Sequence, residues 1–262
     1  MIRRAVIVFA LTLVSAAAMA SYDIIPCVVG NKWTYDCYKV YTGDVRFQGK
    51  SMNKINDASY GTSTYEVLAM DKSQPPVYDY KETTQTSSST GGSDSTDQVD
   101  LRLSSDDAGQ HVISSYQTST GMDSPDRQDY DPSLLYFPKD TSVGKTWTVG
   151  NMREENTLIP MTAKVVGKET VTVPAGTFKD CLRVVYSCDN ISGTVDVWQK
   201  QFNITSGKSR GIYWIAEGVG VVKELEIATS TAEAPGPDGT PVTIESSQCS
   251  VSELRPGYTV KK

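Results

Sequence analysis

The side chain best suited to acid–base chemistry is His111, the one histidine in the 262 residues. A serine or cysteine nucleophile activated by histidine would have to use it. Its surroundings, Gln110-His111-Val112-Ile113, are typical of a strand start and carry no nucleophile motif such as G-x-S-x-G. No phosphate loop or dinucleotide fingerprint is found. The sequence therefore predicts no enzyme, and it offers no catalytic, cofactor-binding or metal-binding residue.

A second set of reactive side chains consists of five cysteines, Cys27, Cys37, Cys181, Cys188 and Cys249. In an oxidising compartment this odd number leaves at least one thiol unpaired. Cys27 and Cys37 flank a plausible turn and are the favoured local pair. If the segment between Cys181 and Cys188 is extended, their α-carbons lie about 23 Å apart, beyond the roughly 7 Å that a disulfide spans. Reduced core cysteines are an equally good interpretation. With one histidine, the spacing does not indicate a zinc site.

Carboxylates are concentrated in one segment, at Asp123, Asp126, Asp129 and Asp131. Clustered carboxylates can bind calcium, but this spacing lacks the pattern and the glycine of an EF-hand loop. Neighbouring prolines favour a solvated linker, and the calcium alternative stays open.

Residues 1–20 have the features of a secretory signal peptide. Arg3 and Arg4 precede an apolar run, and Ala18-Met19-Ala20 matches a cleavage site. The run is too short to span a bilayer, and the next residue, Ser21, is not a lipid-modified cysteine. We expect bacterial export to the periplasm or the medium, cleavage after Ala20 and no membrane span.

The charge balance argues against nucleic-acid binding. The chain has 25 Lys and Arg against 31 Asp and Glu, a net charge of −6, and it becomes more acidic once the signal arginines are removed. Phosphate recognition needs clustered basic side chains, and the sequence has none.

Alternating apolar and polar residues predict strands throughout the remaining chain. Val, Thr, Tyr and Ile dominate these segments, and turn-forming residues separate most of them. The predicted strands are 33–41, 63–70, 77–81, 99–103, 110–117, 145–149, 157–166, 169–173, 177–187, 194–202, 211–216, 220–228 and 241–253. The fold class is therefore all-β and mainly antiparallel.

Two segments are predicted to lie outside the sheet. Thr83–Asp97 is almost wholly Ser, Thr, Gly and Asp, which predicts a long mobile loop. Ala232–Thr240 holds a Pro-Gly-Pro-Asp-Gly turn. Thr118–Pro132 is the best candidate boundary between two halves, residues 21–125 and residues 126–262.

The phrase V-G-x-x-W-T occurs twice, at Val29–Thr34 and at Val143–Thr148, each a few residues after a proline. It predicts two similar halves that each open with a turn and a tryptophan strand. Trp33 and Trp147 should occupy equivalent core positions, with a ligand-facing wall as the alternative.

A more specific phrase lies in the second half. Val171–Phe178 reads VTVPAGTF and is followed by Cys181-Leu182-Arg183-Val184, and Tyr213–Lys223 reads YWIAEGVGVVK. This combination resembles the TapB-like family of exported bacterial proteins of unknown function. The resemblance covers the opening strand and most of residues 132–225. It implies a fold similar to the LolA-type half-barrel carriers, with a curved half-barrel or barrel-like sheet and an apolar concave face.

These features together favour an exported, non-enzymatic binding or assembly module. A curved apolar face would hold a small hydrophobic ligand or a segment of a protein partner. The first alternative is a surface-associated structural or adhesion protein. A hydrolase is less favoured, because it would depend on His111 alone.

Overall fold

The computed structural model describes residues 26–89, 94–120, 125–154, 156–197, 199–236 and 238–261. In this part of the chain all regular structure is β-strand, and 13 strands form one antiparallel sheet. The strands are β1 (Lys32–Phe47), β2 (Lys50–Asp71), β3 (Val77–Ser88), β4 (Ser95–Ser105), β5 (Gly109–Ser119), β6 (Asp126–Pro138), β7 (Thr146–Glu154), β8 (Thr157–Val173), β9 (Gly176–Cys188), β10 (Ser192–Val197), β11 (Lys200–Ala216), β12 (Gly220–Pro235) and β13 (Pro241–Leu254). The all-β antiparallel prediction is confirmed.

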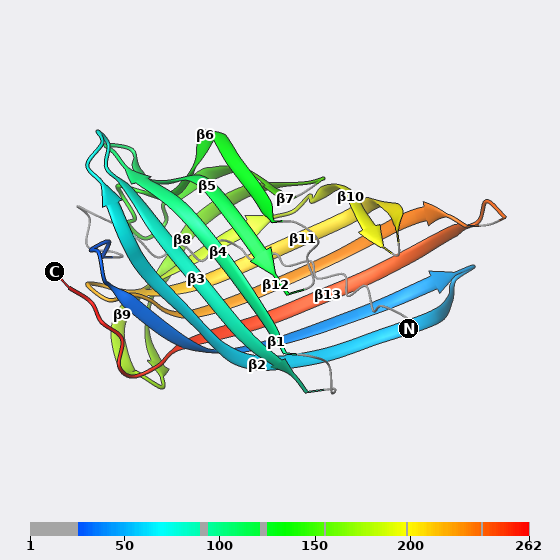
Figure 1. Cartoon of the computed structure of the whole chain (residues 1–262), viewed down its shortest axis with the longest axis horizontal. Helices are drawn as coiled ribbons and strands as arrows, with labels where there is room; N and C mark the ends of the chain where they lie inside the picture. Colours follow the sequence, from blue (N-terminus) through cyan, green and yellow to red (C-terminus); the bar gives the residue numbers. More distant parts are fainter. Residues whose placement is uncertain are drawn as a thin grey trace.

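The strand order is β10-β8-β9-β11-β12-β13-β1-β2-β3-β4-β5-β6, and β7 adds to β8. Most neighbours follow one another along the chain, as in a meander. The exception at the centre is the pairing of β13 with β1, in which Val40 lies opposite Cys249. Figure 1 shows a strongly twisted sheet whose long central strands run the length of the molecule. This arrangement is consistent with the curved half-barrel type of sheet that the sequence predicts.

One face of the curved sheet, the inner face, carries the main apolar core. Tyr186 of β9 is fully buried at its centre, stacked on Tyr136 with ring centroids 5.1 Å apart. Phe137, Trp147 and Tyr213 meet the same ring edge-on at 5.2 to 6.1 Å. Such pairs add to the free energy of burial. The same buried cluster contains Trp33, Tyr65 and Tyr80 from the first half, so strands from both halves of the chain share one core that is rich in aromatic side chains.

The first V-G-x-x-W-T phrase forms a tight turn that leads into β1. Gly30 has φ of 86°, which a residue with a β-carbon rarely adopts, and the Asn31 N–H donates to the Val28 carbonyl at 2.9 Å. The Gly30 N–H donates to the carbonyl of Val67 on β2 at 2.8 Å. Trp33 follows as the second residue of β1, with no exposed surface.

The second copy repeats this geometry before β7. Gly144 has φ of 93°, and the Lys145 N–H donates to the Ser142 carbonyl at 3.0 Å. The Gly144 N–H donates to the carbonyl of Val165 on β8 at 2.8 Å. Trp147, the second residue of β7, is also buried. The two tryptophans therefore hold equivalent local positions, as predicted.

The prediction of a mobile loop over Thr83–Asp97 is wrong for its described residues. Residues 83–88 complete β3 and residues 95–97 begin β4, while residues 90–93 lie outside the described part. Hydroxyl groups pair across the strands, as between Thr86 and Ser95 at 2.7 Å. Threonine favours strands, and these cross-strand hydrogen bonds stabilise a strand pair that buries little apolar surface.

The linker interpretation of the acidic segment is also wrong. Asp126, Asp129 and Asp131 belong to β6, where Asp126 lies opposite Gln117 and Asp129 opposite Ser114. The described residues of Thr118–Pro132 lie mainly in β5 and β6, which pair with each other. Asp123 lies outside the described residues. No described group of three His, Cys, Asp or Glu side chains is arranged to hold a metal ion.

The other predicted strands are found, mostly longer than expected. The segments 157–166 and 169–173 form one strand, β8, while 194–202 divides into β10 and β11 at Gln199, which has φ of 63°. Strand β6 and the first half of β2 were not predicted. The predicted signal peptide lies outside the described residues. The described part contains no helix that is long and apolar enough to cross a membrane.

Candidate binding site

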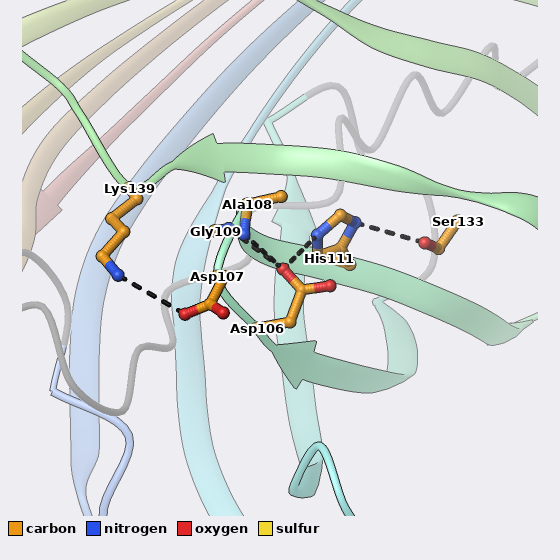
Figure 2. Close-up of polar contacts among 7 residues, drawn as sticks. All are labelled: Asp106, Asp107, Ala108, Gly109, His111, Ser133 and Lys139. Carbon is orange, nitrogen blue, oxygen red and sulfur yellow. Dashed lines mark hydrogen bonds and ion pairs between the residues drawn. The ribbon is translucent and has the colours of Figure 1, made fainter.

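His111 has a serine and an aspartate as hydrogen-bond partners. Its Nε2 lies 3.1 Å from Oδ1 of Asp106, and its Nδ1 lies 3.2 Å from Oγ of Ser133. Figure 2 shows the ring between the two side chains. Sequence reasoning missed Ser133, because β6, which carries it, was not recognised as a strand beside β5.

The hydrogen bonds of His111 differ from those of the histidine in a catalytic triad. A triad serine bonds to Nε2 and the aspartate to Nδ1, the reverse of the order found at His111. Oδ1 of Asp106 also accepts the N–H groups of Ala108 and Gly109 at 2.8 and 3.2 Å. Burial raises the pKa of Asp106, but these N–H groups and His111 outweigh it, so the pKa is lowered. Asp106 thus closes the β4–β5 turn, and His111 connects this turn to Ser133 on β6.

We expect His111→Ala to lower the free energy of unfolding by about 1 kcal/mol or less, because its ion-pair partner Asp106 is half exposed. Ligand binding should be unchanged. Thermal melts and binding measurements on His111→Ala and Ser133→Ala will check this. Loss of a measured activity with the fold intact would overturn the non-enzymatic interpretation.

A second sequence pattern also lacks a nucleophile's geometry. Gly207-Lys208-Ser209-Arg210-Gly211 matches G-x-S-x-G, a match that the sequence interpretation did not consider. That motif acts at a sharp turn from a strand into a helix, where the serine is exposed. Here Ser209 lies within β11, between Cys188 of β9 and Ala228 of β12, and it is buried on the inner face.

All five cysteines are free thiols, so the predicted Cys27–Cys37 pair is wrong. Cys27 precedes the turn at residues 28–31, but β1 then runs extended for six residues to Cys37. At about 3.3 Å per residue, this places the α-carbon of Cys37 roughly 16 Å from that of Lys32, where the strand begins. The alternative of core cysteines holds for Cys27, Cys181 and Cys188, which are buried. Burial raises the pKa of Cys37 to about 11.

Polar side chains occupy the middle of the inner face, where three rows cross β11, β12, β13 and β1. We call these rows the polar layer. They are Tyr213-Glu224-Ser252-Cys37, Gly211-Glu226-Ser250-Lys39 and Ser209-Ala228-Gln248-Tyr41. On one side lies the main core, and on the other a small apolar cluster that includes Val45, Phe202 and Ile244. The apolar inner face expected from the sequence is thus interrupted.

Buried carboxylates dominate the first two rows. Glu224 and Glu226 hydrogen-bond to each other, and the hydroxyl of Tyr213 donates to Glu226 at 3.0 Å. Burial raises the pKa of Glu226 to about 7. Burial and the charge of Glu226 raise the pKa of Glu224 well above its usual value.

Glu82 of β3 extends this group of carboxylates toward the first half of the sheet. Its Oε1 accepts hydroxyl groups from Tyr65 at 2.9 Å and from Ser63 and Thr84 at 3.1 Å each. A buried charge is tolerated only when hydrogen bonds replace its hydration. The three hydroxyl groups around Oε1 of Glu82 therefore replace the water that this buried carboxylate would otherwise bind.

Lys39 faces the same carboxylates from β1. Its Nζ forms no ion pair with a described carboxylate, since none of their oxygens lies within 4.0 Å of it. Burial lowers the pKa of Lys39, and the charges of Asp97, Glu226 and Glu154 act in the opposite direction. The ammonium group thus sits in a negative field without a direct partner.

The third row contains polar atoms without partners. The hydroxyl of Tyr41, Oε1 of Gln248 and Oγ of Ser209 are buried and have no hydrogen-bond partner in the described residues. Tyr41 and Gln248 also line a small hollow with Ile191, Ala228, Ser230 and Ser246. Leaving a buried polar group unsatisfied costs about 1–3 kcal/mol, so a hydrogen-bond donor at any of these atoms would stabilise the folded state.

The outer face has a hollow of a different kind. It measures about 500 Å³, is open to solvent and lies over β1, β2 and β3; its lining is Lys32, Thr62, Thr64, Glu66, Leu68, Lys81, Thr83 and Gln85. Beside it Tyr38 and Tyr60 lie opposite each other on β1 and β2 and are more than half exposed.

Comparisons with known proteins give a family but no activity. None of the curated proteins matches the chain significantly. A crystal structure of a candidate lipoprotein from Parabacteroides distasonis ATCC 8503 covers 91% of this chain and 99% of its own, with a TM-score of 0.34 and 13% identity. The DUF3108-like family model matches residues 29–226, whereas the TapB-like and LolA-type resemblances stay predictions. The chain belongs to the DUF3108-like family.

Proposed function

We propose that this protein is an exported, non-enzymatic binding module that holds a small polar ligand against its inner face. The observation that carries the proposal is the third row of the polar layer, where Tyr41, Gln248 and Ser209 each present a buried polar atom without a partner. Binding sites commonly combine apolar walls with a few polar groups, and this row lies between the two apolar clusters.

The inner face favours a polar ligand over the hydrophobic one that the sequence suggests. Its apolar part is filled by the protein's own rings, with Tyr186 among Tyr136, Phe137 and Trp147. The unsatisfied groups are a hydroxyl, a hydroxyl and an amide oxygen. A hydrocarbon would leave all three without hydrogen bonds.

Native mass spectrometry of the protein, purified without denaturant, tests this function. We expect a small polar adduct that is lost in the Gln248→Leu variant, which removes the unpartnered oxygen. The matched control is Gln201→Leu, an exposed glutamine on β11. A bare polypeptide mass, also after incubation with a small-molecule extract of the producing cells, would rule the proposal out.

Export is the part of the proposal that rests on residues 1–20. We expect the secreted or periplasmic form to begin at Ser21, because Ala18-Met19-Ala20 fits the signal peptidase site. Intact-mass analysis of protein recovered from the periplasm and the medium measures this. A species that retains the first 20 residues would contradict it.

Adhesion through the outer face is the second candidate, favoured by the exposed pair Tyr38 and Tyr60 beside the polar hollow. Aromatic rings with neighbouring hydroxyl and amide groups suit flat polar surfaces. The double variant Tyr38→Ser and Tyr60→Ser should then abolish attachment to cells. If attachment persists, this face is not the adhesive one.

A further inference from the structure

We propose that the outer-face hollow over β1, β2 and β3 binds a segment of a neutral polysaccharide. The inference goes beyond the inner-face function and gives a ligand class to the second candidate, adhesion through this same face. Seven of the eight side chains that line the hollow are polar, and the exposed rings of Tyr38 and Tyr60 lie beside it. A sugar ring presents hydroxyl groups at its edge and C–H groups on its faces, so it needs both kinds of partner.

The hydrogen-bonding groups of the hollow come from neighbouring strands. Thr62 and Thr64 of β2 lie opposite Gln85 and Thr83 of β3, and all four line the same hollow. Ser63, between the two threonines of β2, points the other way and is buried. The side chains of Thr62, Thr83 and Gln85 form no hydrogen bond with another described residue. They can therefore bond to a ligand without breaking a contact within the protein.

The tyrosine pair forms an aromatic platform at one end of the hollow. Tyr38 and Tyr60 lie directly opposite each other on β1 and β2, and they are 52% and 61% exposed. Opposite residues hold their β-carbons about 5 Å apart, so the two side chains stand next to each other. Thr62 follows on the same side of β2, roughly 7 Å further along the strand. A chain that stacks on the rings therefore reaches the hydroxyl groups of the hollow.

The charges of the hollow favour an uncharged ligand. Lys32 and Glu66 form an ion pair at 3.5 Å, and Lys81 lies between Glu66 and Asp100 on neighbouring strands. Two cations and two carboxylates thus alternate across β1, β2, β3 and β4 and leave no net charge that would attract a polyion. An ammonium group only donates and a carboxylate only accepts, whereas a sugar hydroxyl can do either.

The shape of the hollow favours a polymer over a small molecule. Its volume of about 500 Å³ suits a small ligand, but it is open to solvent, whereas small-molecule sites bury most of the ligand surface. From Tyr60 to Glu66 the outer face extends roughly 20 Å along β2, and a chain can contact this whole length. A protein partner is less favoured, because Leu68 is the one apolar side chain in the lining and protein interfaces have an apolar centre.

Binding of the full chain to immobilised glycans tests the proposal. The neutral probes are linear oligomers of glucose, mannose, galactose and N-acetylglucosamine, and the acidic probes are polygalacturonate and dextran sulfate. We expect binding to at least one neutral oligomer and none to the acidic probes. Calorimetry with the bound oligomer should show an affinity about tenfold or more lower in the double variant Tyr38→Ala and Tyr60→Ala, because both stacking surfaces are lost.

Further variants localise the effect. Gln85→Leu should also weaken binding, because it removes an amide of the lining. The matched control is Tyr116→Ala, which changes an exposed tyrosine of β5 outside the hollow and should retain the affinity. All these side chains are exposed, so the variants should melt like the wild type, and a lost affinity then reports binding rather than folding.

Three results would each overturn the polysaccharide assignment: binding to none of the probes, binding to the acidic probes as strong as to the neutral ones, or an unchanged affinity in the double tyrosine variant. The inner-face function fails separately, because Gln248→Leu should bind glycans like the wild type. If the double variant loses attachment to cells while no glycan binds, adhesion stands with a protein receptor and the polysaccharide is wrong.

Discussion

Replacing Trp33 or Trp147 by alanine is expected to lower the free energy of unfolding by about 3–5 kcal/mol in each case. Both rings are buried in the core. Each also donates its indole N–H to a distant carbonyl, Trp33 to Val219 at 2.7 Å and Trp147 to Leu135 at 3.1 Å. Alanine removes both the packing and the hydrogen bond. A loss of this size is a large share of a domain's stability.

Urea unfolding of the two variants, followed by intrinsic fluorescence, gives the measurement. Trp214→Ala is the control, because Trp214 is only partly buried and should lose roughly 1–2 kcal/mol. If Trp147→Ala melts like the wild type while Trp33→Ala unfolds, the repeated phrase has no common structural role.

The Glu226→Gln variant is expected to be more stable than the wild type at pH 8, by roughly 3 kcal/mol, and nearly equal to it at pH 4. Burial raises the pKa of Glu226 from 4.5 to about 7. The folded state thus holds a proton that the unfolded state releases. This contribution is fully present below pH 4.5 and is lost as the pH rises through 7. Glutamine resembles the protonated acid and does not titrate.

Chemical unfolding at pH 4, 5, 6, 7 and 8 measures the effect. The wild type should lose stability across this range more steeply than Glu226→Gln. The control Glu245→Gln alters an exposed carboxylate on β13 and should follow the wild type. Parallel pH profiles for wild type and Glu226→Gln would show that burial does not perturb this carboxylate.

Local patterns were sufficient for the fold class, for most strands and for the two tryptophan turns. Composition predicts a loop over Thr83–Asp97 and is wrong for the described residues, because low hydrophobicity does not by itself mean disorder. Threonine-rich strands can pair through their hydroxyl groups, as Ser63 and Thr84 do at 2.6 Å. A single-sequence pattern does not reveal which strand will lie beside them.

The polar layer was missed for a different reason. Simple alternation along β12 would place Leu225 and Ile227 inside. Instead an irregularity opposite Trp214 and Ile215 inserts one extra residue between Val221 and Lys223. A bulge of this kind reverses which residues face inward. Glu224 and Glu226 therefore point to the interior, and Ile227 is 43% exposed.

The pairing of β13 with β1 also sets the order in which the protein can fold. Strand β1 pairs with β2 as soon as both are available, but its second partner, β13, comes last among the strands: Tyr35 lies opposite Leu254 and Phe47 opposite Val242. Contacts of such long sequence separation slow folding, since the intervening loop must close first. Until β13 is available, the strands on either side of this pairing can form only local hairpins and meanders. The pairing of β13 with β1 then joins them, so the centre of the sheet is completed later than its two flanks.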